Sequence, residues 1–512
     1  MKTVTSSQMR ELDRITIESG IPGEALMERA GTGAGEFILE FLSSLHASHA
    51  RRFVMLAGKG NNGGDAYVVA RFLSRKTSIP VKIFSTCGID ELSGDAKANA
   101  EKLPGGISFE ACGELKPSDF SDGDIIIDGL LGTGISGPLR KPFGQWIGTV
   151  NSLGNPVISL DIPSGLNGDN GSIADAAVKA DLTITIGMPK TGLFVGQGPA
   201  TCGRLRLVDI GIPGRFIEKI SSDINSIFES DVRKFLGRID MNSHKGSRGH
   251  VFVLGGSWKY GGAPFLAGEA ALRSGSGLVT VAVPESLPPA RHMLSLIVRK
   301  IPDKGSGFFS ADPFPLVSKL ISASDSAVVG PGISDESSVR DLVQLLSAVE
   351  KPIVFDADAL NIISKNPEII VKRIYPSVLT PHPKEMKRLL KGFGLEKLIN
   401  AERLAQATAL ADKTHSTVVL KGHRTIVAAR GRKPYVNSSG SPALATAGSG
   451  DVLSGMIASF IAQGISSFEA SMCAVFIHGL AGEEGSFGIR GLTADDLPGI
   501  IPGTMKRISP FA

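Results

Sequence analysis

Short apolar segments alternate with glycine-rich turns and helix-like stretches along most of the chain, and this alternation restricts the fold more than any other feature. Strands that alternate with helices form parallel sheets joined by right-handed crossovers. The sequence therefore predicts an α/β fold. We expect strands in the first half at 52–57, 81–84, 124–127, 157–160, 182–186 and 205–208, and in the second at 250–254, 326–329, 353–355, 378–379 and 417–420.

The pattern begins anew at His250, after a connecting segment and helix expected over Ile227–Asp240. A chain of 512 residues also exceeds what one ordinary hydrophobic core supports. We therefore predict two domains, residues 1–225 and 226–512.

The charge and cysteine content exclude several classes of protein. A net charge of +4 is small for this length and predicts neither a nucleic-acid partner nor a basic membrane patch. The four cysteines are scattered without zinc-type spacing, which is typical of a reducing cytoplasm. No apolar run approaches a membrane span, and the N-terminus has no apolar core of a signal peptide. We expect a cytoplasmic protein.

A glycine-rich turn follows the first strand. Gly58, Gly60 and Gly63 match the spacing of the dinucleotide-binding fingerprint between a strand and a helix. The acidic residue expected at the end of the next strand is missing, because that strand ends in Phe84-Ser85-Thr86. An ordinary NAD-binding dehydrogenase is therefore disfavoured, and no GxxxxGK[ST] segment supports a P-loop ATPase.

Polar side chains follow several strands of the first half, where open α/β sheets bind ligands. Asn62, Asp128 and Ser164 carry oxygen atoms that can ligate a hard cation together with backbone carbonyls. Asp161 and Lys190 follow two further strands. Each aspartate alone can simply hold its own loop, but several polar strand ends in one sheet favour a site.

The segment Ala447–Asp451 is a second glycine-rich turn, which enters the helix expected over Val452–Ala462. Backbone N–H groups and the positive helix end make such a turn a binding site for an anion, usually a phosphate. Asp451 has two interpretations, because a carboxylate repels phosphate. It either caps the helix or serves as a base where a hydroxyl group meets a phosphoryl group.

Other strand ends of the second half carry polar groups whose roles stay open. His382 lies between two prolines, which favours a ligand contact over a merely solvated side chain. Lys421 and Thr425 can hold a nucleotide, although each alone is a weak signal. Trp258 and Tyr260 can stack on a ring or pack against protein equally well.

Taken in order, these motifs resemble one family over nearly the whole chain. The first half is similar to NAD(P)H-hydrate epimerase domains, and the second to ADP/ATP-dependent NAD(P)H-hydrate dehydratase domains. The segments that carry the resemblance are 5–13, 61–65, 128 with 132–138, 161–165 and 190, then 245–246, 255–257, 330–332, 356–359, 380–385, 421–425 and 448–451. Two departures, Pro264 in a helix start and Lys384 in the Pro-Gly-Glu turn, touch no proposed catalytic atom.

The resemblance implies a Rossmann-like three-layer domain with a parallel sheet, followed by a ribokinase-like α/β domain. It implies repair of hydrated NADH and NADPH, in which the first domain interconverts the R and S hydrates. Asn62, Asp128 and Ser164 would surround a potassium ion, and Asp161 would act in proton transfer. The implied substrate contacts of the epimerase are Asn61, Asn62, Gly63, Gly64, Asp65, Gly132, Thr133, Gly134, Ile135, Ser136, Gly137, Pro138 and Asp161.

The second domain would dehydrate the S hydrate while ADP becomes AMP and phosphate. ADP is the expected donor, ATP is an alternative, and magnesium is expected with the nucleotide. Asp451 would deprotonate the C6 hydroxyl, which attacks the terminal phosphate before the phosphoester eliminates. The implied substrate contacts are Ala263, Gly332, His382 and Asp451, and the implied nucleotide contacts are Lys421, Gly422, His423, Arg424, Thr425 and Gly450.

Two other functions remain open at this point. A small-molecule kinase with a ribokinase-like domain would keep its phosphoester product, but the epimerase-like half argues against it. A non-catalytic binding protein is disfavoured because both Asp161 and Asp451 stand in their motifs. We also expect a homo-oligomer.

Overall fold

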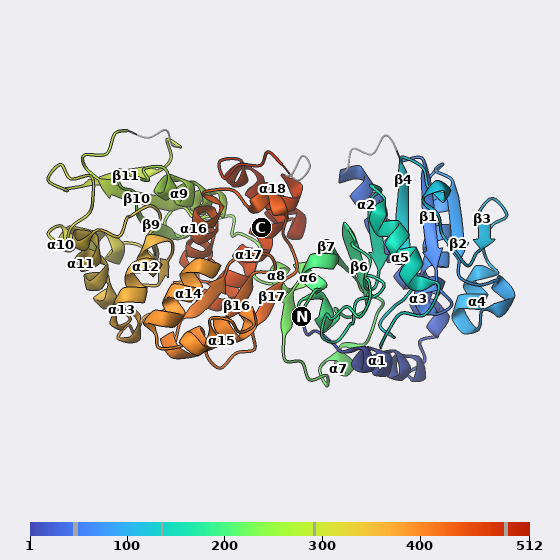
Figure 1. Cartoon of the computed structure of the whole chain (residues 1–512). Coiled ribbons are helices and arrows are strands. Elements are labelled where there is room, and N and C mark those ends of the chain that lie inside the picture. Colours follow the sequence, from blue (N-terminus) through green and yellow to red (C-terminus); the bar gives the residue numbers. More distant parts are fainter. Residues whose placement is uncertain (45–49, 135–136, 290–292, 486–489, 512) are drawn as a thin grey trace. The chain divides into compact units, whose positions relative to one another are not determined.

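The computed structural model describes residues 1–44, 50–134, 137–289, 293–485 and 490–511. The chain forms two compact units, Met1–Ser226 and Ile227–Ala512, and each contains a mainly parallel sheet flanked by helices (Figure 1). The predicted α/β class is confirmed. None of the helices in the described ranges is long and apolar enough to cross a membrane.

The first unit is built on a seven-stranded, wholly parallel sheet. Its strands, in spatial order, are β3 (Ser108–Ala111), β2 (Val81–Ser85), β1 (Arg52–Ala57), β4 (Asp124–Gly129), β5 (Val157–Leu160), β6 (Leu182–Ile186) and β7 (Arg204–Val208). The order reverses between β1 and β4, which creates a ligand-binding switch point at the carboxyl ends of these strands.

Helices cover both faces of this sheet, as alternate residues of β1 show. Phe53 and Met55 belong to a core with residues of α1, α2 and α3, whereas Val54 and Leu56 belong to a core with residues of α5. Side chains of a strand alternate between faces, so the unit has three layers. The helices are α1 (Ser6–Glu18), α2 (Gly23–Ser44), α3 (Asn61–Lys76), α4 (Gly94–Ala100), α5 (Phe143–Ser152), α6 (Gly198–Thr201) and α7 (Gly214–Ile217).

The second unit has a sheet that is parallel up to β15 and antiparallel from β15 to β17. The order is β11 (Ile297–Ile301), β10 (Leu278–Pro284), β9 (His250–Leu254), β12 (Ser326–Val329), β13 (Ile353–Phe355), β14 (Ser377–Leu379), β15 (Thr417–Leu420), β16 (Ile426–Ala428), β17 (Tyr435–Asn437) and β8 (Asn225–Ile227). Its switch point lies between β9 and β12.

One apolar core of this unit joins alternate residues of β9 and β10 to three long helices. These are α16 (Ser449–Ala462), α17 (Ser467–Glu484) and α18 (Leu497–Ile508); α17 packs against the other two, and α16 and α18 also pack against α9 (Ala263–Arg273). The remaining helices are α8 (Glu229–Arg233), α10 (Phe314–Ser322), α11 (Ser337–Leu345), α12 (Asp358–Lys365), α13 (Glu368–Val371), α14 (Pro383–Gly392) and α15 (Arg403–Thr414).

Candidate active sites

A cleft of about 690 Å³ opens at the switch point of the first unit. It lies where α1 and the start of α3 face the carboxyl ends of β1, β4, β5 and β6. The predicted site residues that line it are Asn61, Asn62, Asp65, Gly132, Thr133, Gly134, Pro138 and Asp161. Gly63, Gly64 and Gly137 do not line the cleft, and Ile135 and Ser136 lie outside the described residues.

Glycines let the loops at this switch point approach one another closely. A Cβ atom on Gly58 would come within 1.9 Å of the Leu130 carbonyl oxygen, and one on Gly63 within 2.0 Å of the Gly58 carbonyl oxygen. Side chains there would force the β1 turn, the β4 turn and helix α3 apart. Gly63 thus acts by packing behind the cleft.

Asp128 is the centre of a buried polar cluster at the end of β4. Its carboxyl oxygens accept hydrogen bonds from Ser164 Oγ at 2.6 Å and Ser159 Oγ at 2.8 Å. Burial raises the pKa of Asp128, and the hydrogen bonds from Ser164 oppose that shift. Asn62 Nδ2 donates to the Leu131 carbonyl at 3.1 Å, whereas its Oδ1 is buried without a hydrogen-bond partner among the described residues. The cluster brings the three predicted cation ligands together with one unused oxygen.

Asp161 and Lys190 form an ion pair at the ends of β5 and β6. Asp161 Oδ1 also accepts from the Ile186 N–H at 3.1 Å, and Lys190 Nζ donates to the Ile186 carbonyl at 2.7 Å. The backbone of Asp161 is left-handed, with φ of 63°, which a non-glycine residue adopts at some cost. Its carboxylate is therefore held in place, with Lys190 almost fully buried behind it.

Three further carboxyl groups line the cleft, those of Asp13, Asp65 and Asp95, and only Asp65 was a predicted contact. Asp13, on α1, has its pKa raised to about 6 by burial and by Asp161, against the opposing effect of Lys190. Burial, followed by the charge of Asp161, raises the pKa of Asp65 well above its usual range. Asp13 ends the N-terminal motif, yet its sequence position alone indicated no role.

In the second unit, Lys421 reaches from the end of β15 to two other loops. Its Nζ lies 2.6 Å from Asp356 Oδ1, after β13, and a Cβ atom on Gly450 would come within 3.1 Å of that same Nζ. Asp356 Oδ2 is buried with no hydrogen-bond partner among the described residues. Burial lowers the pKa of Lys421, but Asp356 and Glu385 raise it further, so the net shift is upward. A permanent positive charge thus borders the glycine-rich turn.

Asp451 is the third residue of α16 and does not cap the helix. The N-cap is Gly448, with φ of 89°, and the capping interpretation of Asp451 is therefore wrong. Burial, followed by the charge of Asp356, raises the pKa of Asp451 to about 8. Asp358 and Glu385 add to this shift and Lys421 opposes it. The carboxyl group can accept and return a proton near neutral pH.

His382 is fixed by the start of helix α14. Its Nδ1 accepts the Lys384 N–H at 3.0 Å, which leaves the proton of a neutral ring on Nε2, 3.2 Å from Glu385 Oε1. Burial, then the charge of Lys421, lowers the pKa of His382. Burial raises the pKa of Glu385 to about 7. The imidazole is therefore neutral, and its exposed part faces solvent or a ligand.

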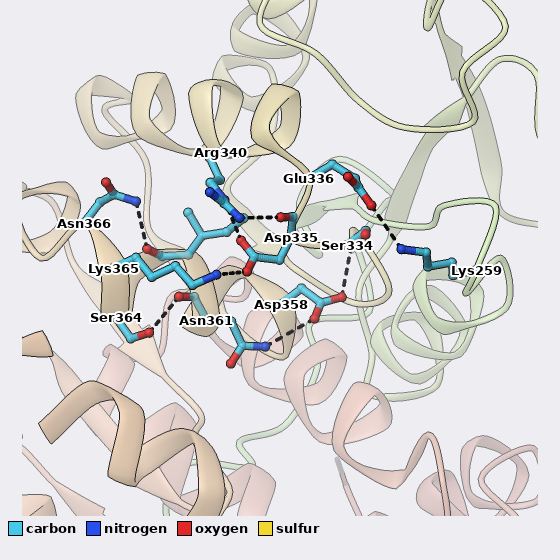
Figure 2. A network of polar contacts seen from close by, with 11 residues as sticks. Lys259, Ser334, Asp335, Glu336, Arg340, Asp358, Asn361, Ser364, Lys365 and Asn366 are labelled. Carbon is cyan, nitrogen blue, oxygen red and sulfur yellow. Dashed lines mark hydrogen bonds and ion pairs between the residues drawn. The ribbon is translucent and has the colours of Figure 1, made fainter. Parts of the chain in front are cut away.

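Ala263 and Gly332, two predicted substrate contacts, lie side by side at the second switch point. A Cβ atom on Gly332 would come within 3.3 Å of Ala263 Cβ, and Ser257 Oγ donates to the Gly332 carbonyl at 2.7 Å. Figure 2 shows how the next residues are anchored: the Ser334 N–H donates to Asp358 Oδ2 at 2.9 Å. Asp335 also binds side chains of α11 and α12, at Arg340 and Lys365. The loop is therefore fixed on both sides of Gly332.

Arg403 was not predicted from the sequence, and it shapes the loop after β15. Its guanidinium donates to the carbonyls of His423 at 2.6 Å and of Lys421 at 3.2 Å. The Arg424 side chain is buried and donates to the Ser438 carbonyl, so that a nucleotide would meet its backbone. Thr425 Oγ1 donates to the Gly422 carbonyl at 2.9 Å. Lys421–Thr425 is thus one rigid turn.

The chain matches two family models, described as YjeF-related protein N-terminus over residues 23–192 and NAD(P)H-hydrate dehydratase over residues 251–502. It is 36% identical to the bifunctional NAD(P)H-hydrate repair enzyme of Moorella thermoacetica, covering 99% of this chain and 97% of that protein. The chain belongs to the family of bifunctional NAD(P)H-hydrate repair enzymes. The resemblance inferred from the motifs is confirmed.

Other members of the NAD(P)H-hydrate repair family are similarly close. The enzyme of Coxiella burnetii is 35% identical, with 96% of each chain covered, and that of Escherichia coli strain K12 is 33% identical, with 91% of this chain and 87% of that protein covered. Among solved structures, the ADP/ATP-dependent NAD(P)H-hydrate dehydratase of Bacillus subtilis, co-crystallized with ATP/Mg2+, is 28% identical. The match covers 56% of this chain and 100% of the Bacillus subtilis chain, with a TM-score of 0.47.

Proposed function

We propose that residues 1–225 interconvert the R and S hydrates of NADH and NADPH, and that residues 226–512 dehydrate the S hydrate with ADP as phosphate donor. ATP is the alternative donor. Family membership supports the overall reaction. The observation that carries the dehydratase assignment is the cluster of Asp451, Lys421 and Asp356 beside the Gly448–Gly450 turn, because it combines a titratable base with a positively charged phosphate site.

The dehydration divides into a phosphoryl transfer and an elimination. Asp451 takes the proton of the C6 hydroxyl, and the hydroxyl oxygen attacks the terminal phosphorus of ADP, releasing AMP. N–H groups of the turn and the Lys421 ammonium stabilise the charge on the transferring group. The C6–O bond of the phosphoester then breaks as the lone pair of ring nitrogen N1 forms an N1=C6 bond. Phosphate leaves with that oxygen, and transfer of a C5 proton to the departing phosphate or to water restores the dihydropyridine.

A pKa near 8 suits Asp451 to this role. A general base works best when its pKa lies close to the operating pH, because it then accepts protons while a sufficient fraction is ionised. A nearby magnesium ion, expected with the nucleotide phosphates, would neutralise part of their charge. Within the described residues, no three His, Cys, Asp or Glu side chains lie close enough to hold a metal by themselves. The phosphates would therefore supply most of its ligands.

In the epimerase half, the polar cluster at Asp128 fits a potassium ion. The unpartnered Asn62 Oδ1, the Asp128 carboxylate and the Ser164 hydroxyl are the oxygen ligands that a hard cation prefers. The ion would offset the buried charge of Asp128 and steady the loop that carries Gly132. Asp161, oriented by Lys190, faces the same cleft and would move a proton at the C6 hydroxyl of the hydrate.

The proposal is tested by incubating chemically hydrated NADH with the whole protein and ADP. We expect dihydronicotinamide absorbance to return, with AMP and free phosphate as co-products. Both epimers should be consumed. A stable phosphoester in the mass spectrum would instead identify a kinase. Consumption of the S epimer alone, with the R epimer left unchanged, would refute the epimerase assignment.

A further inference from the structure

The cleft of the first unit holds more carboxyl groups than the proposed mechanism uses. Asp13, Asp65 and Asp161 line it, and they share a single buried lysine, Lys190, which is paired with Asp161. Both Asp13 and Asp65 are partly buried, and within the described residues the carboxyl of neither forms a hydrogen bond to the protein. Partial burial in the cleft without a protein partner makes these carboxyl groups costly to keep ionised, and this points to a role toward a ligand or in a reaction.

We propose that Asp13 is the second proton-transferring group of the epimerase and works together with Asp161. This inference rests on the proposed epimerase function. Asp13 comes from helix α1, whereas Asp161 follows strand β5, so the two carboxyls enter the cleft from different walls. Both carboxyls line the same cleft, where burial and the charge of Asp161 raise the pKa of Asp13.

Inversion at C6 explains the need for two groups. In one direction, Asp13 donates a proton to the C6 hydroxyl, the C6–O bond breaks, and water leaves as the N1 lone pair forms an N1=C6 iminium. Water then adds to the opposite face of C6, the electrons of the N1=C6 bond return to N1, and Asp161 takes one proton from the adding water. The hydrate is inverted, and one proton has passed from Asp13 to Asp161. In the reverse direction the carboxyls exchange roles.

The charges around Asp13 suit both roles. Burial raises the pKa of Asp13, Lys190 lowers it and Asp161 raises it, which gives a value of about 6. Both protonation states are therefore populated close to neutral pH. Burial, followed by the charge of Asp161, raises the pKa of Asp65, on α3. Other charged side chains that line the cleft are Arg10, Lys59, Asp95 and Arg140.

The test compares Asp13→Asn, Asp13→Glu and Glu11→Gln in the full-length chain. Glu11 lies on the same helix, but it is exposed and paired with Arg14, and it does not line the cleft. The probe is purified R hydrate of NADH, with R-to-S interconversion followed by chromatography across the pH range around 6. Dehydration of the S hydrate with ADP is measured on the same samples.

We expect Asp13→Asn to slow interconversion about 100- to 10,000-fold, the usual effect of losing a general acid or base. Its remaining activity should lose the titration near pH 6, Asp13→Glu should retain part of the rate, and Glu11→Gln should equal the wild type. Wild-type interconversion by Asp13→Asn would overturn the inference. The inference would also be overturned if Asp13→Asn lost both activity and melting temperature and Asp13→Glu did not restore the activity, because that result would indicate a structural role. Failure of the wild-type protein itself would refute the epimerase function instead.

Discussion

Asp451→Asn removes the proposed base and nearly preserves its shape, and we expect it to lower activity while raising stability. Burial and neighbouring carboxylates raise the pKa of Asp451 from 3.8 to about 8. The folded chain therefore keeps a proton on this group over a pH range in which the unfolded chain has lost it. Because the folded state binds the additional proton, the contribution of Asp451 to the free energy of unfolding falls as pH rises from about 4 to about 8.

The size of the effect follows from the shift. One pKa unit corresponds to about 1.4 kcal/mol, so the difference of about 3 units between pH 7 and the ordinary pKa sets an upper limit of about 4 kcal/mol. Partial exposure of Asp451 reduces this value. Asparagine cannot ionise, and we expect Asp451→Asn to raise the free energy of unfolding by about 2–4 kcal/mol at neutral pH.

The assay is thermal unfolding without nucleotide, at about pH 5 and about pH 8. The melting transition of the second unit should rise by several degrees at the higher pH and much less at the lower one, since a gain of 1 kcal/mol corresponds to roughly 2–4 °C in a protein of this size class. Asp412→Asn, an exposed aspartate on α15, is the matched control and should change little.

Activity provides the second half of this prediction. Dehydration of the S hydrate should fall about 100- to 10,000-fold. ADP should bind at least as well by calorimetric titration, because asparagine keeps the size of Asp451 and can never carry a negative charge beside the phosphates. A mutant that dehydrates at a near-normal rate would refute the base assignment. A mutant less stable than wild type at the higher pH would refute the claim that Asp451 is held protonated at the expense of stability.

Three further outcomes are expected. A fragment of residues 226–512 should be soluble and should dehydrate the S hydrate, since it contains nearly all of the second compact unit. A folded but inactive fragment would mean that the site is shared. Asp161→Ala should leave S dehydration intact but slow consumption of the R hydrate, as chromatography of the two epimers can show. Replacing potassium by lithium should impair epimerisation but not dehydration, and Asn62→Ala should remove this dependence on the ion. Equal rates of epimerisation by the wild-type protein in both salts would argue against the cation site.

Most of the strands that are buried on both faces could be predicted, although β10 was missed. Segments such as Val157–Leu160 and Leu182–Ile186 are apolar throughout because helices cover both sides of the sheet, and the structure has strands at these same positions. A capping box formed by Thr5 and Gln8 begins α1. Strand β3 was not predicted, because it lies at the sheet edge and is largely exposed, so it leaves no apolar run. The three-residue strands β16 and β17 are too short for a periodic signal.

The sequence predicted the polar residues that follow the strands, but not which of these residues form ion pairs. The sequence indicated Asp161 and Lys190, or Asp356 and Lys421, as separate polar residues after separate strands. Their pairing depends on sheet order: β5 lies beside β6, whereas β13 and β15 are separated by β14. Asp13 could not be recognised at all, because an aspartate on an amphipathic helix is ordinarily solvated. It matters only because α1 forms one wall of the cleft.

Asp451 shows why one motif could not decide its own chemistry. The Gly-Ser-Gly-Asp sequence allowed Asp451 to be either the cap or the base. The backbone excludes the cap, because Gly448, with a left-handed φ of 89°, is the N-cap. The raised pKa then depends on burial and on carboxyl groups from two other strand ends, those of Asp356, Asp358 and Glu385. No single segment of the sequence contains all of these carboxyl groups. A base with a pKa near neutrality is therefore a property of how the loops converge, and removing Asp356 should lower the pKa of Asp451 without any change in the motif itself.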